Sequence, residues 1–109
     1  MTITEITPDY SVAPQIEPAD VAEIAAQGFR SIMCNRPDGE SAGQAEVATI
    51  RAEAERLGLA FAFVPVISGR IVPEDVDEFR AAIDRLPAPV LAYCRSGARC
   101  QNLWMLAQR

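Results

Sequence analysis

A cysteine and an arginine, separated by four residues, carry the most specific chemistry in this sequence. The segment Cys94–Arg99 reads Cys-Arg-Ser-Gly-Ala-Arg; it follows the apolar run 89–93 and precedes a segment with amphipathic spacing. We therefore expect a loop between a buried strand and a helix, where backbone N–H groups converge and the helix N-terminus adds partial positive charge. Such a site stabilises a thiolate, with a pKa of roughly 3.5–7.5. The segment predicts a nucleophile, Cys94, inside an anion-binding loop.

The other residues of this loop suit the binding of an anion. Arg99 offers a planar fork to an oxyanion, and a cation is otherwise unfavourable in the first turn of a helix. Arg95 is expected either to assist in binding or to point to solvent. Ser96 can bond to the thiolate or the substrate, Gly97 permits a close backbone approach or a positive φ, and Ala98 completes the anion-binding loop.

Four further residues have both a structural and a functional interpretation. Cys100 could resolve an adduct on the nucleophile, but we favour packing under the helix. Cys34 is likewise expected to pack in the core. Asn35 and Arg36 could line the same pocket, although a plain turn explains the residues that follow them equally well.

Composition excludes several classes of function. The chain has 109 residues, a net charge of −5, ten basic residues that are all arginine, and no histidine. Its length predicts one domain, 1–109. The absence of histidine excludes Cys-His and Ser-His-Asp catalysis and histidine-based metal sites, and we expect no cofactor. The acidic charge argues against nucleic acid. We see neither a membrane span nor a signal peptide, which makes the cytoplasm the expected location.

Apolar periodicity and turn residues predict alternating strands and helices. Strands are expected at 10–13, 29–34, 59–66 and 89–93, and helices at 18–27, 43–57, 73–86 and from the loop to the end of the chain. This alternation predicts an α/β fold with a central, mostly parallel sheet of about four strands flanked by helices. Ligands of such sheets bind at the carboxyl ends of the strands. We therefore expect the loops 34–41 and 94–99 to face one another.

Several motifs resemble a known family. They are Gln15-Ile16 before the first helix, Asn35–Glu40, Val64-Pro65-Val66 and Pro89–Gly97. Together they resemble the phosphatase-like domain of the beta-lactamase hydrolase-like proteins, also called DUF442, while the loop 94–99 resembles that of rhodanese-type sulfurtransferases. The resemblance implies a dual-specificity-phosphatase-like fold, with the active loop between the last strand and the following helix. It also implies a link to sulfide oxidation, with a partner or fused enzyme of that pathway. The family usually continues past residue 109, which favours a chain truncated at its C-terminus.

The sequence departs from true protein tyrosine phosphatases at three places. Those enzymes have five residues between cysteine and arginine, a histidine before the cysteine, and an aspartate acid after the strand that ends here at Pro65-Val66. This chain has four residues, Tyr93, and Ile67-Ser68 in those places. Loss of a general acid costs a phosphatase roughly 10²–10⁴-fold in rate, whereas a sulfite or thiolate leaving group needs no acid.

These departures rank three functions. The first is a sulfurtransferase that moves sulfane sulfur from thiosulfate or a persulfide through a persulfide on Cys94. The second is a cysteine-dependent phosphatase that forms a phosphoenzyme on Cys94 from a phosphomonoester. The third is a non-enzymatic sulfur-relay or anion-binding module that acts on a partner. The sequence does not identify the physiological donor or acceptor.

Overall fold

The computed structural model describes all 109 residues and contains a five-stranded sheet. The strands are β1 (Thr4–Thr7), β2 (Tyr10–Ala13), β3 (Ser31–Cys34), β4 (Ala60–Phe63) and β5 (Val90–Tyr93), in the spatial order β1-β2-β5-β3-β4. Strands β2, β5, β3 and β4 are parallel to their neighbours, and only β1 is antiparallel. The expected α/β fold with a mostly parallel sheet is therefore confirmed.

The sheet has one strand more than the sequence predicted. Strand β1 lies in the N-terminal segment, for which we predicted no strand, and it pairs Thr4 with Val12 and Thr7 with Tyr10. It is short and occupies an edge of the sheet, so its own side chains carry little of the apolar alternation that marks a strand. Strand β1 is therefore stabilised by its pairing with β2 rather than indicated by its own sequence pattern.

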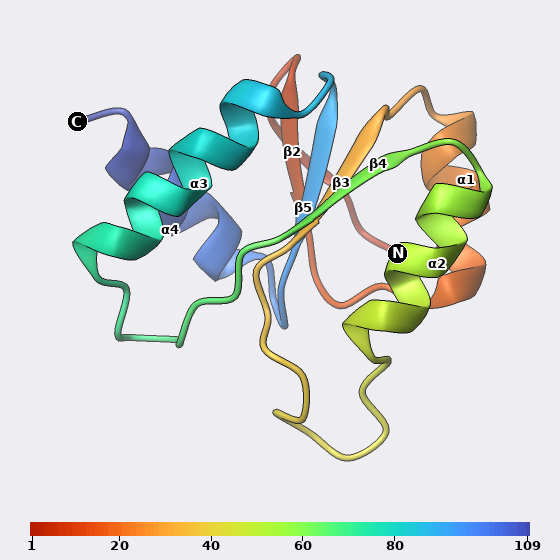
Figure 1. The fold of residues 1–109 in the computed structure, drawn as a ribbon, viewed down its shortest axis with the longest axis horizontal. Coiled ribbons are helices and arrows are strands. Elements are labelled where there is room, and N and C mark those ends of the chain that lie inside the picture. Colours follow the sequence, from red (N-terminus) through yellow and green to blue (C-terminus); the bar gives the residue numbers. More distant parts are fainter.

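Helices cover both faces of the sheet. A 3₁₀ turn (Pro18–Asp20) leads into α1 (Val21–Ala26), and α2 (Val47–Arg56), α3 (Pro73–Arg85) and α4 (Ala98–Ala107) follow. Figure 1 shows α1 and α2 on one side of the sheet and α3 and α4 on the other. This layered arrangement places the loops after β3, β4 and β5 at the same, lower edge of the sheet (Figure 1).

The second helix begins later than its composition suggested. We expected it from residue 43, but α2 starts at Val47, whose backbone N–H donates to Asp38 Oδ1 at 2.8 Å. The carboxylate satisfies an amide that has no partner within the helix. Residues between β3 and α2 are thus left as a long loop, free to contact the loop after β5.

Each of the four parallel strands divides its side chains between two core clusters. In β3, Ile32 packs with α1 and α2 residues such as Ile24, whereas Met33 packs with α3 and α4 residues such as Phe79 and Leu103. All five side chains are fully buried or nearly so. Because both faces of a parallel sheet are covered, its strands are apolar throughout rather than alternating. These two layers fix the ends of the strands from which the site loops begin.

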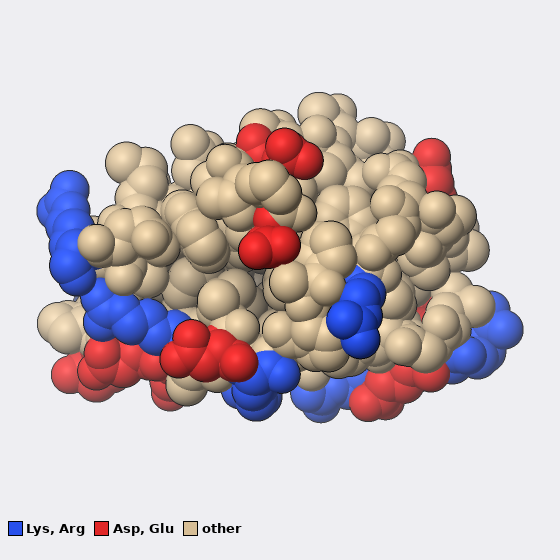
Figure 2. Space-filling view, turned by 90° about the horizontal axis from the view of Figure 1, so that it is seen from above, with Lys and Arg blue, Asp and Glu red and all other residues tan.

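Charge is distributed unevenly over the surface. Figure 2 views the molecule from above Figure 1, from the edge of the sheet opposite the loops after β3 and β5. Charged side chains gather mainly along one rim of that face, and most of the remaining surface carries no charged residue (Figure 2). None of the helices has the length and apolar character needed to cross a bilayer.

Candidate active site

Cys94 immediately follows β5 and is fully buried at the start of the loop that leads into α4. Its sulfur accepts a hydrogen bond from the backbone N–H of Gly97 at 3.0 Å. Gly97 has a φ of +94°, a left-handed conformation that L side chains rarely adopt. The glycine therefore lets the loop turn back so that its amide points at the nucleophile, as the sequence predicted.

The pKa of Cys94 is lowered to about 5. The neighbouring Cys100 side chain, acting as a donor to the sulfur, is the largest cause; burial opposes it, and backbone N–H groups of Cys100, Arg99 and Gly97 add to it. These amides belong to the loop and the first turn of α4, where they have no helical partner. Cys94 is thus a thiolate at neutral pH, which is the reactive form of a cysteine nucleophile.

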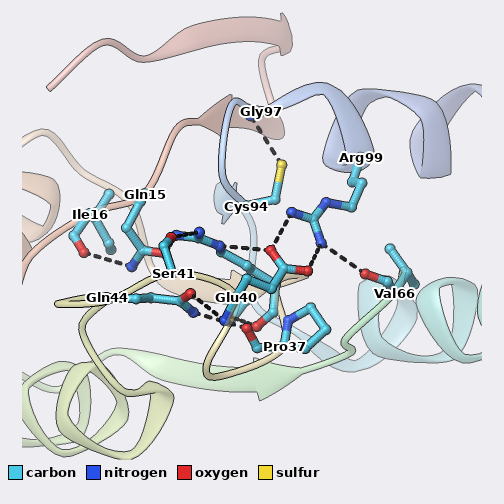
Figure 3. A network of polar contacts seen from close by, with 12 residues as sticks. Gln15, Ile16, Pro37, Glu40, Ser41, Gln44, Val66, Cys94, Gly97 and Arg99 are labelled. Carbon is cyan, nitrogen blue, oxygen red and sulfur yellow. Dashed lines mark hydrogen bonds and ion pairs between the residues drawn. The ribbon is translucent and has the colours of Figure 1, made fainter. Parts of the chain in front are cut away.

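Arg99 lies in the first turn of α4, and its guanidinium is buried against a carboxylate of the chain itself. Its Nη1 donates to Glu40 Oε2 and its Nη2 to Glu40 Oε1, each at 2.8 Å, and Nη1 also donates to the Val66 carbonyl at 3.0 Å. The sequence predicted a fork for an oxyanion, and the structure contains such a fork, bound to Glu40 (Figure 3). The predicted proximity of the loops after β3 and β5 is confirmed by this contact.

A second arginine holds the same carboxylate from the other side. Arg36 Nε donates to Glu40 Oε1 at 2.9 Å, and its two terminal nitrogens donate to Gln15 Oε1 at 3.0 Å and Ser41 Oγ at 2.6 Å. Hydrogen bonds from Arg99, and then from Arg36, lower the pKa of Glu40 to about 2. Because of this low pKa, the carboxylate of Glu40 is ionised at any physiological pH. Figure 3 shows the network extending from Gln15 to Arg99.

A surface pocket adjoins the loop. It is lined by Glu40, Ser68, Arg95, Ser96, Ala98 and Arg99. Four residues of the predicted anion-binding loop are therefore together on one pocket, and the side chain of Arg95 is exposed. Gly97 faces a neighbouring hollow instead, beside Val12 and Ala13.

The two residues suggested for the pocket after β3 lie elsewhere. Asn35 is fully buried and donates through Nδ2 to the Val64 carbonyl at 2.8 Å, which joins the ends of β3 and β4. Arg36 is 3% exposed, and the network described above uses its guanidinium. Neither lines the pocket, because each satisfies internal polar groups. Glu40, which the sequence analysis did not select, lines the pocket instead. The sequence feature that could have identified it is its position four residues after Arg36, in a loop at the carboxyl edge of the sheet.

The remaining cysteines and Tyr93 are buried. Cys34 donates its thiol to the Arg36 carbonyl at 3.2 Å, and burial raises its pKa. Cys100 is fully buried beside Cys94, and burial raises its pKa strongly. Burial also raises the pKa of Tyr93, the residue in the place of the phosphatase histidine. No three His, Cys, Asp or Glu side chains lie close enough together to hold a metal ion.

The fold and the loop between its last parallel strand and α4 define a dual-specificity-phosphatase-like protein. A mutant form of a protein designated Tk-PTP superposes with a TM-score of 0.69 over 88% of this chain and 62% of its own, at 18% identity. A proposed phosphatase of the DUF442 group from Shewanella putrefaciens gives a TM-score of 0.85 at 20% identity, covering 97% of this chain and 69% of its own. At these identities the likeness concerns the fold alone.

Sequence comparison then gives the family. Residues 2–109 match the model of the beta-lactamase hydrolase-like protein, phosphatase-like domain, and the chain belongs to this family. A beta-lactamase hydrolase-like protein of Xylella fastidiosa is 36% identical over 108 residues, which are 99% of this chain and 25% of that protein. A proposed phosphatase of Neisseria meningitidis is 38% identical, with a TM-score of 0.91 over 99% of this chain and 77% of its own.

These findings bear on the two enzymatic hypotheses unequally. They confirm the family, the fold and a phosphatase-like class of enzyme. They do not show sulfur transfer, and they fit the phosphatase alternative better. The chain spans about a quarter of the length of the curated relatives it matches, so activities of the longer proteins are not transferred to it.

Proposed function

We propose that the chain is a cysteine-dependent group-transfer enzyme in which the Cys94 thiolate attacks a small anionic substrate and carries the transferred group as a covalent adduct. The observation that carries this proposal is the pKa of about 5 for Cys94, in a loop whose Gly97 amide points at the sulfur. Arg95 supplies positive charge at the adjoining pocket. The sulfur has no exposed surface, so reaction requires it to become accessible from that pocket.

The group that the pocket chemistry suits best is a sulfane sulfur. Cys94 attacks the outer sulfur of thiosulfate, forming a Cys94–sulfur bond while the sulfur–sulfur bond of the donor breaks and sulfite leaves with the electron pair. With a persulfide donor, the leaving group is a thiolate. An acceptor thiolate then attacks the outer sulfur and releases Cys94 as thiolate. Neither leaving group needs a proton.

The pocket has no carboxyl group that could protonate an alkoxide leaving group, and this supports sulfur transfer over phosphate hydrolysis. Glu40 is the single carboxyl group that lines the pocket, and its pKa of about 2 keeps it ionised. An ionised carboxylate cannot donate a proton to a departing alkoxide. A phosphatase without a general acid forgoes roughly 10²–10⁴-fold in rate.

Phosphomonoester hydrolysis is the second candidate, and the comparisons favour it. The family is described as phosphatase-like, and the Neisseria protein as a proposed phosphatase. In this reaction Cys94 attacks phosphorus, the ester P–O bond breaks, and water later hydrolyses the phosphocysteine. An aryl phosphate, whose phenolate leaves more readily than an alkoxide, is the substrate on which such an activity would be seen first.

One side-by-side assay separates the candidates. The protein is incubated with thiosulfate, with glutathione persulfide and with an aryl phosphate, and Cys94→Ser and Cys34→Ser are compared. We expect a mass increase of one sulfur on Cys94, and thiocyanate formation when cyanide is the acceptor, both lost only in Cys94→Ser. Aryl phosphate turnover that depends on Cys94, without sulfur loading, would establish the phosphatase instead.

The same assay addresses the relay hypothesis and the partner. Sulfur loading without turnover would indicate a relay module that needs a partner to accept the sulfur. A sulfide-oxidising enzyme, separate or fused in a longer chain, is the proposed partner, because an enzyme that oxidises sulfane sulfur would consume the sulfur that Cys94 passes on. Adding such an enzyme should then restore turnover, and failure to do so would remove it as a candidate.

A further inference from the structure

The carboxylate of Glu40 occupies one of the two edges of the Arg99 guanidinium at which a substrate oxyanion could bind. Both carboxylate oxygens face the two terminal nitrogens of the guanidinium at 2.8 Å, the parallel arrangement that arginine also offers to phosphate and sulfate. The third bond from Arg99, to the Val66 carbonyl, fixes the guanidinium in place. The end-on fork of Arg99 is therefore filled by a group of the chain.

The carboxylate is also held so that it does not swing away freely. Arg36 Nε binds Glu40 Oε1, and Arg36 is itself buried and fixed by Gln15 and Ser41. Glu40 thus lies between Arg36 and Arg99, which come from different parts of the chain. An incoming anion must either displace this charge-assisted, two-bond contact or bind at the remaining Nε edge of Arg99, and in both cases it lies beside an ionised carboxylate.

The charges around the pocket sum to a small value. Arg95, Arg99 and the buried Arg36 oppose Glu40 and the Cys94 thiolate, so three positive charges face two negative ones, and Arg95 is the exposed cation. A dianion brings two negative charges toward two that are already present. A group with a single negative charge needs only Arg95 and the amides of the loop.

We propose that Glu40 is a specificity-determining residue that occupies the end-on edge of Arg99 and disfavours substrates whose reacting group is a dianion, relative to persulfides, whose reacting group carries at most one negative charge. This inference rests on the proposed function and names its substrate class. It predicts that thiosulfate and phosphomonoesters are poor substrates of the unmodified site, and that a thiol-bound sulfane sulfur is the better donor. The converse role, in which Glu40 merely orients Arg99 for an anion, predicts the opposite response to its removal.

Sulfate binding, measured by isothermal titration calorimetry, tests the inference without any turnover. Glu40→Gln keeps the size of the side chain and removes its charge, and Glu40→Asp keeps the charge but shortens the reach to Arg99. Glu53→Gln is the matched control, because Glu53 is 27% exposed, against 26% for Glu40, and also pairs with an arginine, but on α2 and outside the pocket.

We expect Glu40→Gln to bind sulfate roughly ten-fold more tightly than the unmodified protein, equivalent to about 1.4 kcal/mol, and Glu53→Gln to be unchanged. Glu40→Asp should also bind sulfate more tightly, which keeps the test open if the glutamine variant does not fold. Unchanged or weaker sulfate binding in a folded Glu40 variant would overturn the inference, since it would show an orienting role.

A kinetic measurement then connects the site with its substrate. The ratio of kcat/KM for thiosulfate to that for glutathione persulfide should rise by roughly ten-fold in Glu40→Gln, and a ratio that stays constant or falls would contradict the inference. If Cys94 takes up no sulfur from either donor, the proposed function fails, but the sulfate titration still reports on Glu40 by itself.

Discussion

The reactivity of Cys94 should depend on the thiol of Cys100, which lies in the first turn of α4. The Cys100 side chain is the largest single cause of the lowered pKa of Cys94, ahead of the backbone amides. Cys100→Ala removes this donor and leaves the Gly97 N–H, which bonds to the sulfur at 3.0 Å. The pKa of Cys94 must then rise, because the lost hydrogen bond from Cys100 stabilises the thiolate more than the neutral thiol.

The size of the shift follows from the strength of such a bond. A hydrogen bond to a charged group contributes about 1.5–3 kcal/mol, and we take the lower end because S–H is a weak donor. This corresponds to about one pKa unit, so the pKa of Cys94 should move from about 5 to about 6. At pH 5.5 the thiolate fraction would fall from about 75% to about 25%, whereas at pH 8 it would hardly change.

Ultraviolet absorbance of the thiolate, followed as a function of pH, measures this without a substrate. Cys100→Ser is the matched control, because its hydroxyl retains a donor at nearly the same place and should keep the midpoint near that of the unmodified protein. A midpoint for Cys100→Ala that stays at about 5 would refute the reasoning and assign the low pKa to the backbone amides. Equal shifts in the alanine and serine variants would refute it as well.

Two stability predictions follow from the loops around the site. Gly97→Ala forces an alanine to a φ of +94°, which should lower the free energy of unfolding in urea by roughly 1–2 kcal/mol. Gly58→Ala is the control: its φ of +82° should make it cost as much, but it should leave the reactivity of Cys94 unchanged. Arg36→Ala removes a buried guanidinium and should cost about 3 kcal/mol, whereas Arg56→Ala, at an exposed arginine, should hardly change the free energy of unfolding. Equal costs for the two arginines would contradict the structural role of Arg36.

The nucleophile and its loop were predictable because their determinants are local. An apolar strand, a cysteine, a glycine and a helix start follow each other between residues 90 and 98, and the structure has β5, Cys94, the left-handed Gly97 and α4 in that order. The layering of helices on both faces was predictable for a related reason. Apolar runs separated by amphipathic segments have few alternatives to a covered parallel sheet.

The assignments after β3 were less accurate, because contacts distant in the sequence decide them. Asn35 and Arg36 are polar residues at the carboxyl edge of a strand, which is where a ligand would be expected. The structure turns Asn35 toward Val64 and Arg36 toward Gln15 and Glu40. Strand β1 was missed for a similar reason, since its partner strand rather than its own pattern stabilises it.

The sequence by itself determined that a cysteine stands in an amide-rich turn before a helix, and that no histidine can assist it. Only the tertiary structure decided what Arg99 binds, because Glu40 is 59 residues away along the chain and reaches the guanidinium only when β3 and β5 lie side by side. Periodicity reports which face of an element is buried. It does not report which charged side chains meet at the ends of neighbouring strands, and that meeting sets the charge of the pocket.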